Sequence, residues 1–146
     1  MKIFNKRATY DYDIGEKFEA GINLIGSEVK AVKLGQADLF GSHVRIVGSE
    51  AYLINARVYP YRYAQIEGYD ERRTRKLLLH KKQIFSLKSR LEGSSSTIIP
   101  LSIYTVRGLV KVELALAKGK KKYQKKESIK RRDIQRDVER EIEAKG

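Results

Sequence analysis

The sequence predicts a small, mainly β protein built around an antiparallel β-barrel, with two or three helices and a basic C-terminal tail. Short segments of alternating apolar and polar residues recur at close spacing, and glycine-containing turns separate them, a pattern typical of small barrels. Two segments with helical spacing interrupt these strands, one early and one late in the chain. From residue 118 onward charged residues dominate, and few apolar residues remain to build a core.

The first predicted strand covers residues 18–25. Its alternation places the apolar side chains from Phe18 to Leu24 on one face and the polar ones on the other. Glu19 belongs to the polar face, so we expect its carboxylate to point away from the core.

A short helix is predicted next, over residues 28–34. Ser27 can cap its first turn, and Glu28 complements the positive end of the helix dipole. Gly35 then ends the helix, because glycine readily adopts the left-handed conformation that closes a last turn.

A hairpin is predicted from strands near residues 42–47 and 52–58, with its turn at residues 48–50. The loop that follows, residues 59–69, contains four tyrosines. Their rings could stack on nucleic-acid bases. We favour the alternative that they close one end of the barrel, since tyrosine combines an apolar ring with a polar tip.

A cationic run at residues 73–82 changes within one residue into three adjacent leucines. At least part of this triplet should anchor in a core, because three neighbouring leucines cannot all face water cheaply. The arginines and lysines on either side would then be fixed on a packed surface, where they could hold phosphates. The alternative is the start of a helix with a solvated basic flank.

The last predicted elements are a helix over residues 81–91 and a hairpin of strands 97–106 and 109–116. In the helix, Ile84, Leu87 and Leu91 fall on one side. Pro100 lies within the first strand of the hairpin and cannot donate a ladder hydrogen bond, so that strand should lie at an edge or contain a bulge there. A five-stranded oligonucleotide-binding barrel with helical additions is the nearest standard architecture.

Composition points to a polyanionic partner. The 146 residues include 31 Lys and Arg against 18 Asp and Glu, a net charge of +13, which favours nucleic acid over membrane. No apolar run approaches membrane-spanning length and no signal-peptide core is present, so we expect a cytoplasmic protein that does not bind membranes. Cysteine is absent and the two histidines lie far apart, so neither disulfides nor a metal site or cofactor are expected.

Two regions are predicted: a barrel domain over residues 1–117 and a tail over residues 118–146. The tail holds 12 basic and 6 acidic residues and only a thin apolar stripe of Ile134, Val138 and Ile142. Such a stripe cannot offset the entropy of ordering the backbone. We expect a tail that is disordered when free and becomes helical on RNA; the alternative is a helix docked on the barrel.

Catalysis is not expected, because no group of residues forms a nucleophile site, a phosphate-binding glycine loop or a histidine–carboxylate cluster. The nearest candidate is an acidic cluster of Asp11, Asp13, Glu16 and Glu19, which could bind magnesium in a metal-dependent nuclease.

Six short segments, in this order, resemble the small protein B family, the bacterial SsrA-binding proteins. They are Asn5-Lys-Arg-Ala8 before Tyr12, Phe18-Glu-Ala-Gly-Ile22, Glu28-Val-Lys30, the run at 73–81, Pro100-Leu-Ser-Ile-Tyr104 and Leu116-Ala-Lys-Gly-Lys-Lys121. Each segment alone is weak, but six in order at the expected spacing are specific, and the resemblance extends from about residue 5 to residue 132.

The resemblance implies an oligonucleotide-binding-type barrel that holds the tRNA-like part of transfer-messenger RNA. It implies entry into the A site of a stalled ribosome with elongation factor Tu, for trans-translation and peptide tagging. The tail would contact small-subunit ribosomal RNA in the decoding centre and messenger channel, and the protein would act as a monomer. The alternative is a general structured-RNA-binding or ribosome-associated barrel without an adaptor role.

The resemblance also implies two sets of contact residues. The set on the barrel, for transfer-messenger RNA, is Arg7, Tyr10, Glu19, Lys33, Arg75, Lys76, Leu78 and His80. The set in the tail, for the ribosome, is Lys120, Lys121, Lys122, Tyr123, Lys125, Lys126, Lys130, Arg131 and Arg132. Within the first set, Glu19 should read a base edge or a ribose hydroxyl, because a carboxylate is a poor partner for phosphate. The alternative is a surface carboxylate that only solubilises its strand or pairs with a lysine.

Overall fold

The computed structural model describes residues 2–64 and 66–120. Its strands and helices, in chain order, are β1 (Lys2–Phe4), α1 (Ala8–Asp11), β2 (Tyr12–Ile22), α2 (Gly26–Lys33), β3 (Ala37–Asp38), β4 (His43–Val47), β5 (Glu50–Ile54), β6 (Arg57–Val58), β7 (Arg75–Leu78), α3 (Lys81–Leu91), β8 (Ser96–Val106) and β9 (Leu109–Gly119). The predicted class, a mainly β antiparallel fold of the oligonucleotide-binding type with short helices, is confirmed.

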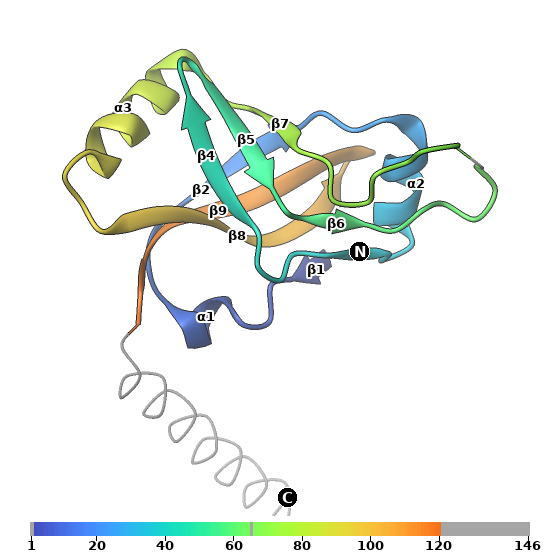
Figure 1. The fold of residues 1–146 in the computed structure, drawn as a ribbon, viewed down its shortest axis with the longest axis horizontal. Helices are drawn as coiled ribbons and strands as arrows, with labels where there is room; N and C mark the ends of the chain where they lie inside the picture. Colours follow the sequence, from blue (N-terminus) through green and yellow to red (C-terminus); the bar gives the residue numbers. More distant parts are fainter. Residues whose placement is uncertain (1, 65, 121–146) are drawn as a thin grey trace, which may run out of the picture.

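The strand pairings run in a ring. They lead from β8 through β4, β5, β7, β2 and β9 and back to β8, and every pair is antiparallel. The long strands β2, β8 and β9 form the frame, and β1 adds to the outer edge of β8. Figure 1 shows α3 beside the β4–β5 hairpin and α1 below the barrel, next to the C-terminal end of β9.

The core fills the space that these strands enclose. Its fully buried side chains include Leu39, Leu53, Leu77, Ile98, Ile103, Val112 and Leu114. Helix α2 adds Ala31 and Val32, and α3 adds Leu87, with Ile84 also buried on the same side of the helix. The predicted span and apolar face of α3 are therefore confirmed.

Pro100 lies at a bulge, one of the two situations predicted for it. The register of β8 against β9 shifts between Pro100 and Ser102. The carbonyl oxygen of Pro100 accepts a hydrogen bond from the side-chain amide of Asn5 at 2.9 Å. The bulge therefore gives the connection between β1 and α1 a fixed point of attachment.

Strand β7 is one of the elements that the sequence pattern does not predict. Along Arg75–Leu78 the side chains alternate between buried and exposed, with Arg75 and Leu77 inside and Lys76 and Leu78 outside. The alternation is hidden in the sequence because the first inward position is an arginine. Of the leucine triplet, Leu77 is buried and Leu79 packs against the core, as the need for an anchor required.

The folded region extends beyond the predicted boundary at residue 117. Strand β9 continues through Gly119, which pairs with Tyr12. The backbone N–H of Lys120 donates to Asp11 at 2.9 Å, and its ammonium donates to the carbonyl of Thr9 at 2.6 Å. The other tail residues named above lie outside the described residues.

A buried ion pair joins α2 to β7. Both side chains of Glu28 and Arg75 are inaccessible to solvent, and Arg75 donates to Glu28 Oε2 through Nε at 2.8 Å and Nη2 at 2.5 Å. Arg73 also donates to Glu28, and the hydroxyl of Tyr69 lies 3.0 Å from Oε2. Arg75 further donates to the carbonyls of Ala56, at 2.8 Å, and Glu71, at 3.0 Å. The cluster thereby connects α2, β7 and the segments on both sides of the tyrosine loop.

Two expectations for this region need correction. Ser27 does not cap α2, because the helix begins at Gly26 and Ile25 occupies the N-cap position. Not all four tyrosines of the loop can close the barrel end. Tyr69 hydrogen-bonds Glu28 in the buried cluster, and Tyr59 and Tyr61 are half-buried, whereas Tyr63 is 76% exposed.

The groups around Glu28 determine how its contribution to the stability of the fold changes with pH. Burial alone would raise the pKa of this carboxyl group, but hydrogen bonds from Arg73, the Ile25 N–H and Arg75, together with the charge of Arg75, outweigh it and lower the pKa. A carboxyl group whose pKa is lower when folded stabilises the fold above its ordinary pKa of 4.5. That stabilisation is lost as the pH falls through the folded-state value.

Replacement of Glu28 by alanine should therefore destabilise the barrel strongly. The change leaves the buried Arg75 without a counter-charge, and breaking a buried pair in this way costs about 3–5 kcal/mol. Urea unfolding followed by circular dichroism would measure the change in the free energy of unfolding.

The matched control is Glu16→Ala, which removes the carboxylate of an exposed ion pair with Arg90 and should leave stability almost unchanged. Equal effects of the two substitutions would contradict the prediction. The prediction would also be contradicted if the Glu28→Ala variant lost as much stability as the parent protein when the pH falls below about 4.5.

Candidate nucleic-acid interface

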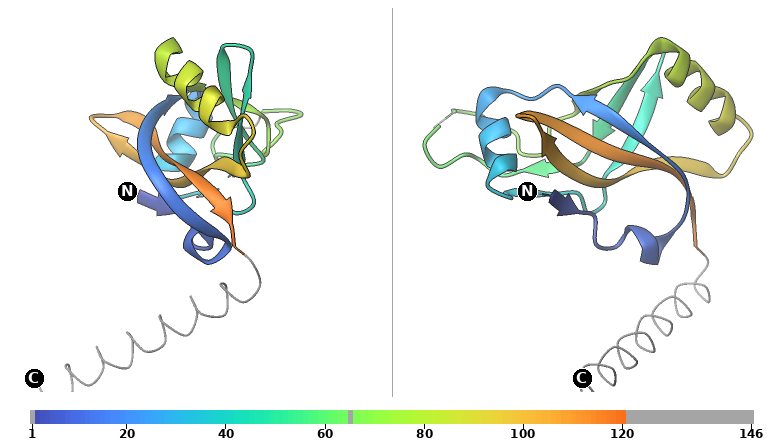
Figure 2. Two further views of the ribbon diagram at one scale, coloured as in Figure 1. Left: turned by 90° about the vertical axis from the view of Figure 1, so that its left-hand side faces the viewer. Right: turned by 180° about the vertical axis from the view of Figure 1, so that it is seen from behind.

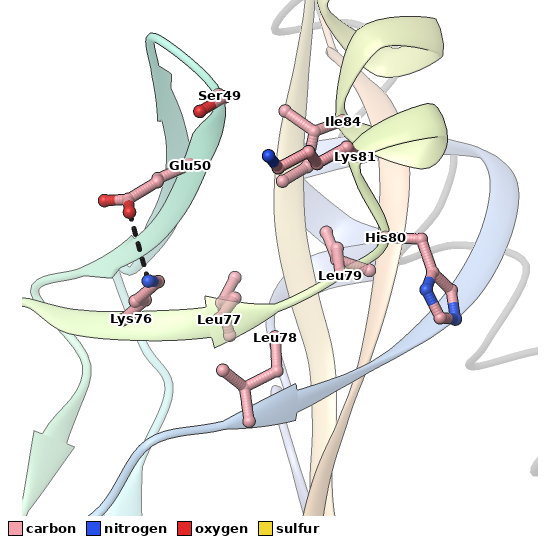
Figure 3. Close-up of a pocket in the computed structure, with 9 residues that line it drawn as sticks. All are labelled: Ser49, Glu50, Lys76, Leu77, Leu78, Leu79, His80, Lys81 and Ile84. Atoms are coloured by element: carbon pink, nitrogen blue, oxygen red, sulfur yellow. Dashed lines mark hydrogen bonds and ion pairs between the residues drawn. The ribbon is translucent and has the colours of Figure 1, made fainter.

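A groove lies where β7 leads into α3. It has a volume of about 370 Å³ and is lined by Ser49, Glu50, Lys76, Leu77, Leu78, Leu79, His80, Lys81 and Ile84. The alternation of β7 directs Lys76 and Leu78 to the exterior, and His80 occupies the N-cap position of α3. Figure 3 shows His80 at the opposite end of the groove from the Lys76–Glu50 pair.

One side of the groove is electrically balanced. The ammonium of Lys76 lies 3.1 Å from the Glu50 carboxylate, which also accepts a hydrogen bond from the hydroxyl of Tyr52. The Tyr52 hydrogen bond, and then Lys76, lower the pKa of Glu50, and the same bond raises the pKa of Tyr52. Lys76 is thus held in one place by a counter-charge, and Lys81 supplies the second cation of the lining.

Leu78 lies against the neighbouring strand, where it faces Gly21 of β2 across the ladder. A Cβ atom at position 21 would lie 3.2 Å from the Leu78 Cβ. Glycine therefore lets Leu78, which is 56% exposed, rest on the surface of β2. The outcome is an apolar, solvent-facing shelf between the groove and β2.

Glu19 projects outward from the same strand, as predicted. It faces Glu113 across the β2–β9 ladder, and its carboxylate accepts a hydrogen bond from Tyr104 on β8. Burial, the Glu19 bond and the charges of Glu19 and Glu113 raise the pKa of Tyr104 to about 12. The Glu19 carboxylate is therefore held in one orientation by a neutral donor.

Among the predicted contact residues within the described part of the chain, Arg75 alone lies away from the surface. Its side chain is fully buried against Glu28, so the guanidinium cannot reach a partner outside the barrel. The sequence shows a basic run, and nothing in that run distinguishes an inward arginine from an outward one. Arg75 acts on the surface only indirectly, by fixing β7.

The other predicted residues lie in two places away from the groove. Arg7 and Tyr10 belong to the α1 region, where the Arg7 guanidinium lies 4.7 Å from the Tyr10 ring centroid and 3.6 Å from Asp11. Lys33 is exposed at the C-terminal end of α2. The structure thus brings together Lys76, Leu78 and His80, with Glu19 on the adjacent strand, and separates them from Arg7 and Tyr10.

Three of the four acidic residues considered for a nuclease site have different partners. Asp11 pairs with Arg7, Glu16 with Arg90, and Glu19 with Tyr104. Within residues 2–64 and 66–120, no group of three His, Asp or Glu side chains is placed to hold a metal ion. In the same part of the chain, no helix is long and apolar enough to cross a bilayer.

Sequence reasoning missed Glu50, Tyr52 and Tyr104. In the sequence, Glu50 belongs to the predicted hairpin turn, and Tyr104 lies in the segment Pro100–Tyr104 with no role of its own. These residues meet their partners only because the strands are paired. Tyr52 lies opposite Lys76, and Tyr104 lies two strands away from Glu19. A sequence signal for these pairs would require the strand register.

Comparisons with known proteins agree on one family. The family model described as "SmpB protein" matches residues 2–144. An SsrA-binding protein of Sulfurihydrogenibium sp. is 49% identical over 89% of this chain and 86% of its own length. One of Thermosipho africanus is 48% identical over 92% of each chain. A chain in the solved structure described as "tmRNA-SmpB: a journey to the center of the bacterial ribosome" has 44% identity and a TM-score of 0.70, covering 83% of this chain and 85% of its own.

The coupling of Glu19 to Tyr104 predicts the effect of Glu19→Gln. The substitution removes the negative charge of Glu19 and replaces a charged acceptor by a neutral amide oxygen, so the pKa of Tyr104 should fall from about 12 toward its ordinary value of 10.0. Alkaline NMR titration of the tyrosine ring carbons would follow it. In the matched variant Glu50→Gln the pKa of Tyr52 should fall instead. A Tyr104 titration unchanged by Glu19→Gln would contradict the coupling.

Proposed function

Since this chain belongs to the SmpB family, whose members include SsrA-binding proteins at 42–49% identity, we propose that it binds the tRNA-like part of transfer-messenger RNA. In this role it delivers that RNA to stalled ribosomes for trans-translation. It acts as an adaptor without catalytic activity, as a cytoplasmic monomer, together with elongation factor Tu.

The observation that most supports this role is the combination of the groove with the Leu78 shelf. A basic, partly apolar surface bounded by a histidine suits an RNA loop, because unstacked bases pack on apolar and aromatic groups while cations hold the backbone. Lys76 and Lys81 provide the cations. Leu78 and His80 provide surfaces on which a base can pack.

Glu19 has a distinct part in this proposal. An outward carboxylate repels phosphates but accepts hydrogen bonds from base amino groups or from a ribose 2′-hydroxyl. Because Tyr104 already orients it, little rotamer entropy remains to be lost on binding. Glu19 would therefore contribute specificity, and the lysines would contribute the salt-dependent part of the affinity.

Residues beyond Lys120 would act on the ribosome. In the proposal, the basic residues of the tail and Tyr123 contact small-subunit ribosomal RNA at the decoding centre and in the messenger channel. The net charge of +6 over residues 118–146 supports a polyanionic partner for this segment. The barrel confers affinity for the RNA, and the tail confers activity once the complex reaches the ribosome.

A gel shift at physiological salt tests the proposed RNA. The protein should bind transfer-messenger RNA more tightly than ordinary tRNA or an unrelated hairpin RNA, because shape and base contacts add to the charge term. Glu19→Ala should weaken that complex, whereas Glu92→Ala, at an exposed carboxylate after α3, should not.

Equal affinity for all three RNAs, collapsing together as salt rises, would instead identify a general RNA-binding barrel. If Glu19→Ala binds transfer-messenger RNA with an unchanged dissociation constant, Glu19 is not part of the interface. The preference for transfer-messenger RNA is tested separately, with the parent protein.

Truncation separates the proposed roles of barrel and tail. The cut belongs after Lys120, because β9 and the Lys120 contacts complete the barrel. The truncated protein should bind transfer-messenger RNA within roughly tenfold of the full chain but should lose peptide tagging in a reconstituted translation system. Loss of most RNA affinity, or retention of tagging, would contradict this division.

A further inference from the structure

A second groove, the β2–α3 groove, lies between β2 and α3. It has a volume of about 250 Å³, and its lining includes Glu16 and Phe18 of β2 and Lys82, Ser86, Leu87 and Arg90 of α3. Figures 1 and 2 show α3 and the C-terminal end of β9 at the same end of the barrel. The β2–α3 groove therefore lies at the end of the barrel from which the C-terminal tail departs.

The floor of the β2–α3 groove is apolar and its rim is charged. Leu87 is 5% exposed and belongs to the core, and Phe18 is half-buried against it. Arg90 pairs with Glu16 across the groove. Helix α3 contains no acidic residue and four cations, which are Lys81, Lys82, Lys88 and Arg90. Glu16 offsets the charge of Arg90, and the three lysines leave the helix positive.

The last part of the chain has the opposite charge. Residues 133–143 contain five acidic residues and two arginines, a net charge of −3, whereas residues 118–132 contain nine basic residues and one acidic residue. Phosphates repel an acidic segment. Residues 133–143, which lie outside the described part of the chain, therefore call for a different partner from the basic stretch before them.

A helix over residues 133–143 would carry one apolar stripe. Ile134, Val138 and Ile142 recur at every fourth position, which places them on one face. At about 3.6 residues per turn, both arginines of the segment fall on the opposite face. The acidic residues that flank the stripe are Asp137, Glu139 and Glu141. The stripe is too thin to order the segment by itself, so a helix here requires a surface that covers the stripe.

The stripe and the β2–α3 groove match in length and in charge. Residues 134–142 would extend about 12 Å as a helix, and the lining of α3 from residue 82 to residue 90 has the same extent. A helix laid along α3 with its stripe on the apolar floor would bring its acidic flanks beside the lysines of α3. Charge complementarity of this kind favours one occupant over others.

The covalent connection makes this groove easy to reach. The backbone N–H of Lys120 donates to the carbonyl of Asp11, next to the start of β2. Glu16 lies about 15 Å further along that strand, whereas residues 121–132 can extend over roughly 40 Å. A tethered segment reaches a nearby site at a roughly millimolar effective concentration, so even weak docking would be well populated.

We propose that residues 133–143 dock as a helix in the β2–α3 groove of their own chain. The stripe covers Phe18 and Leu87, and the acidic flanks pair with the lysines of α3. The basic stretch 121–132 is then a loop held at both ends in the free protein, so its extension along an RNA competes with docking. The contact itself needs no RNA, so it goes beyond the proposed function and is tested without it.

A nitroxide spin label tests the docking in the full chain, because the protein has no cysteine of its own. The label is attached to Arg140→Cys, on the face opposite the stripe. At low salt, the amide NMR signals of residues 16–18 and 82–90 should be lost by paramagnetic relaxation and should return when the nitroxide is reduced. Val138→Asp, which places a charge in the stripe, should prevent the loss.

Helix α3 offers a matched pair of control variants. Ser86→Glu places a carboxylate in the lining of the β2–α3 groove and should release the acidic segment by repulsion. Ser89→Glu adds the same charge at an exposed position of α3 outside that lining and should leave the signal losses unchanged. Thermal melting of each variant checks the fold.

Signals of residues 16–18 and 82–90 that survive in the spin-labelled protein would overturn the proposal. Losses that persist in both Val138→Asp and Ser86→Glu would also overturn it, because the tether alone would then explain the proximity. A mixture of spin-labelled protein with unlabelled, ¹⁵N-enriched protein tests the remaining alternative. The same losses in that mixture would show docking on a second copy and would overturn docking within one chain.

Discussion

The ion pair of Glu28 with Arg75 determines how the rest of this molecule is arranged. Two opposite charges removed from water tolerate little displacement, because each lost hydrogen bond leaves a buried charge unsatisfied. Arg75 makes further bonds to the carbonyls of Ala56 and Glu71, so the pair fixes α2, β7 and the chain on either side of the tyrosine loop. With Arg75 turned inward, the two-residue period of a strand turns Lys76 and Leu78 outward.

This arrangement explains why the surface residues could be predicted more easily than their surroundings. Alternation in residues 18–25 correctly placed Glu19 outside, and helical spacing correctly defined α3, because in both segments the apolar residues mark the inward face. In β7 an inward arginine replaces one of those markers. The pattern then resembles a basic run, and Arg75 joins the predicted contact residues although it belongs to the interior.

The short elements were missed for a different reason. Strands β1 and β3 contain three and two residues, and such segments are held by the strand beside them and not by their own propensity. Likewise, the partners of Lys76 and Glu19 come from neighbouring strands, so they follow from the register of the barrel. The residues of the proposed interface could be named from the sequence, by resemblance, whereas the groups that orient them could not.

The contacts of Lys120 have a geometric consequence for the tethering of whatever follows. Gly119 is paired with Tyr12, and Lys120 is hydrogen-bonded to Thr9 and Asp11. The chain therefore leaves the barrel at a point that is held beside α1. If the barrel binds one molecule and the last residues bind another, the chain segment that separates the two binding sites starts from a fixed point at Lys120. Residues added after Lys120 would lengthen the reach of that span, while residues added before it would first have to break the anchorage.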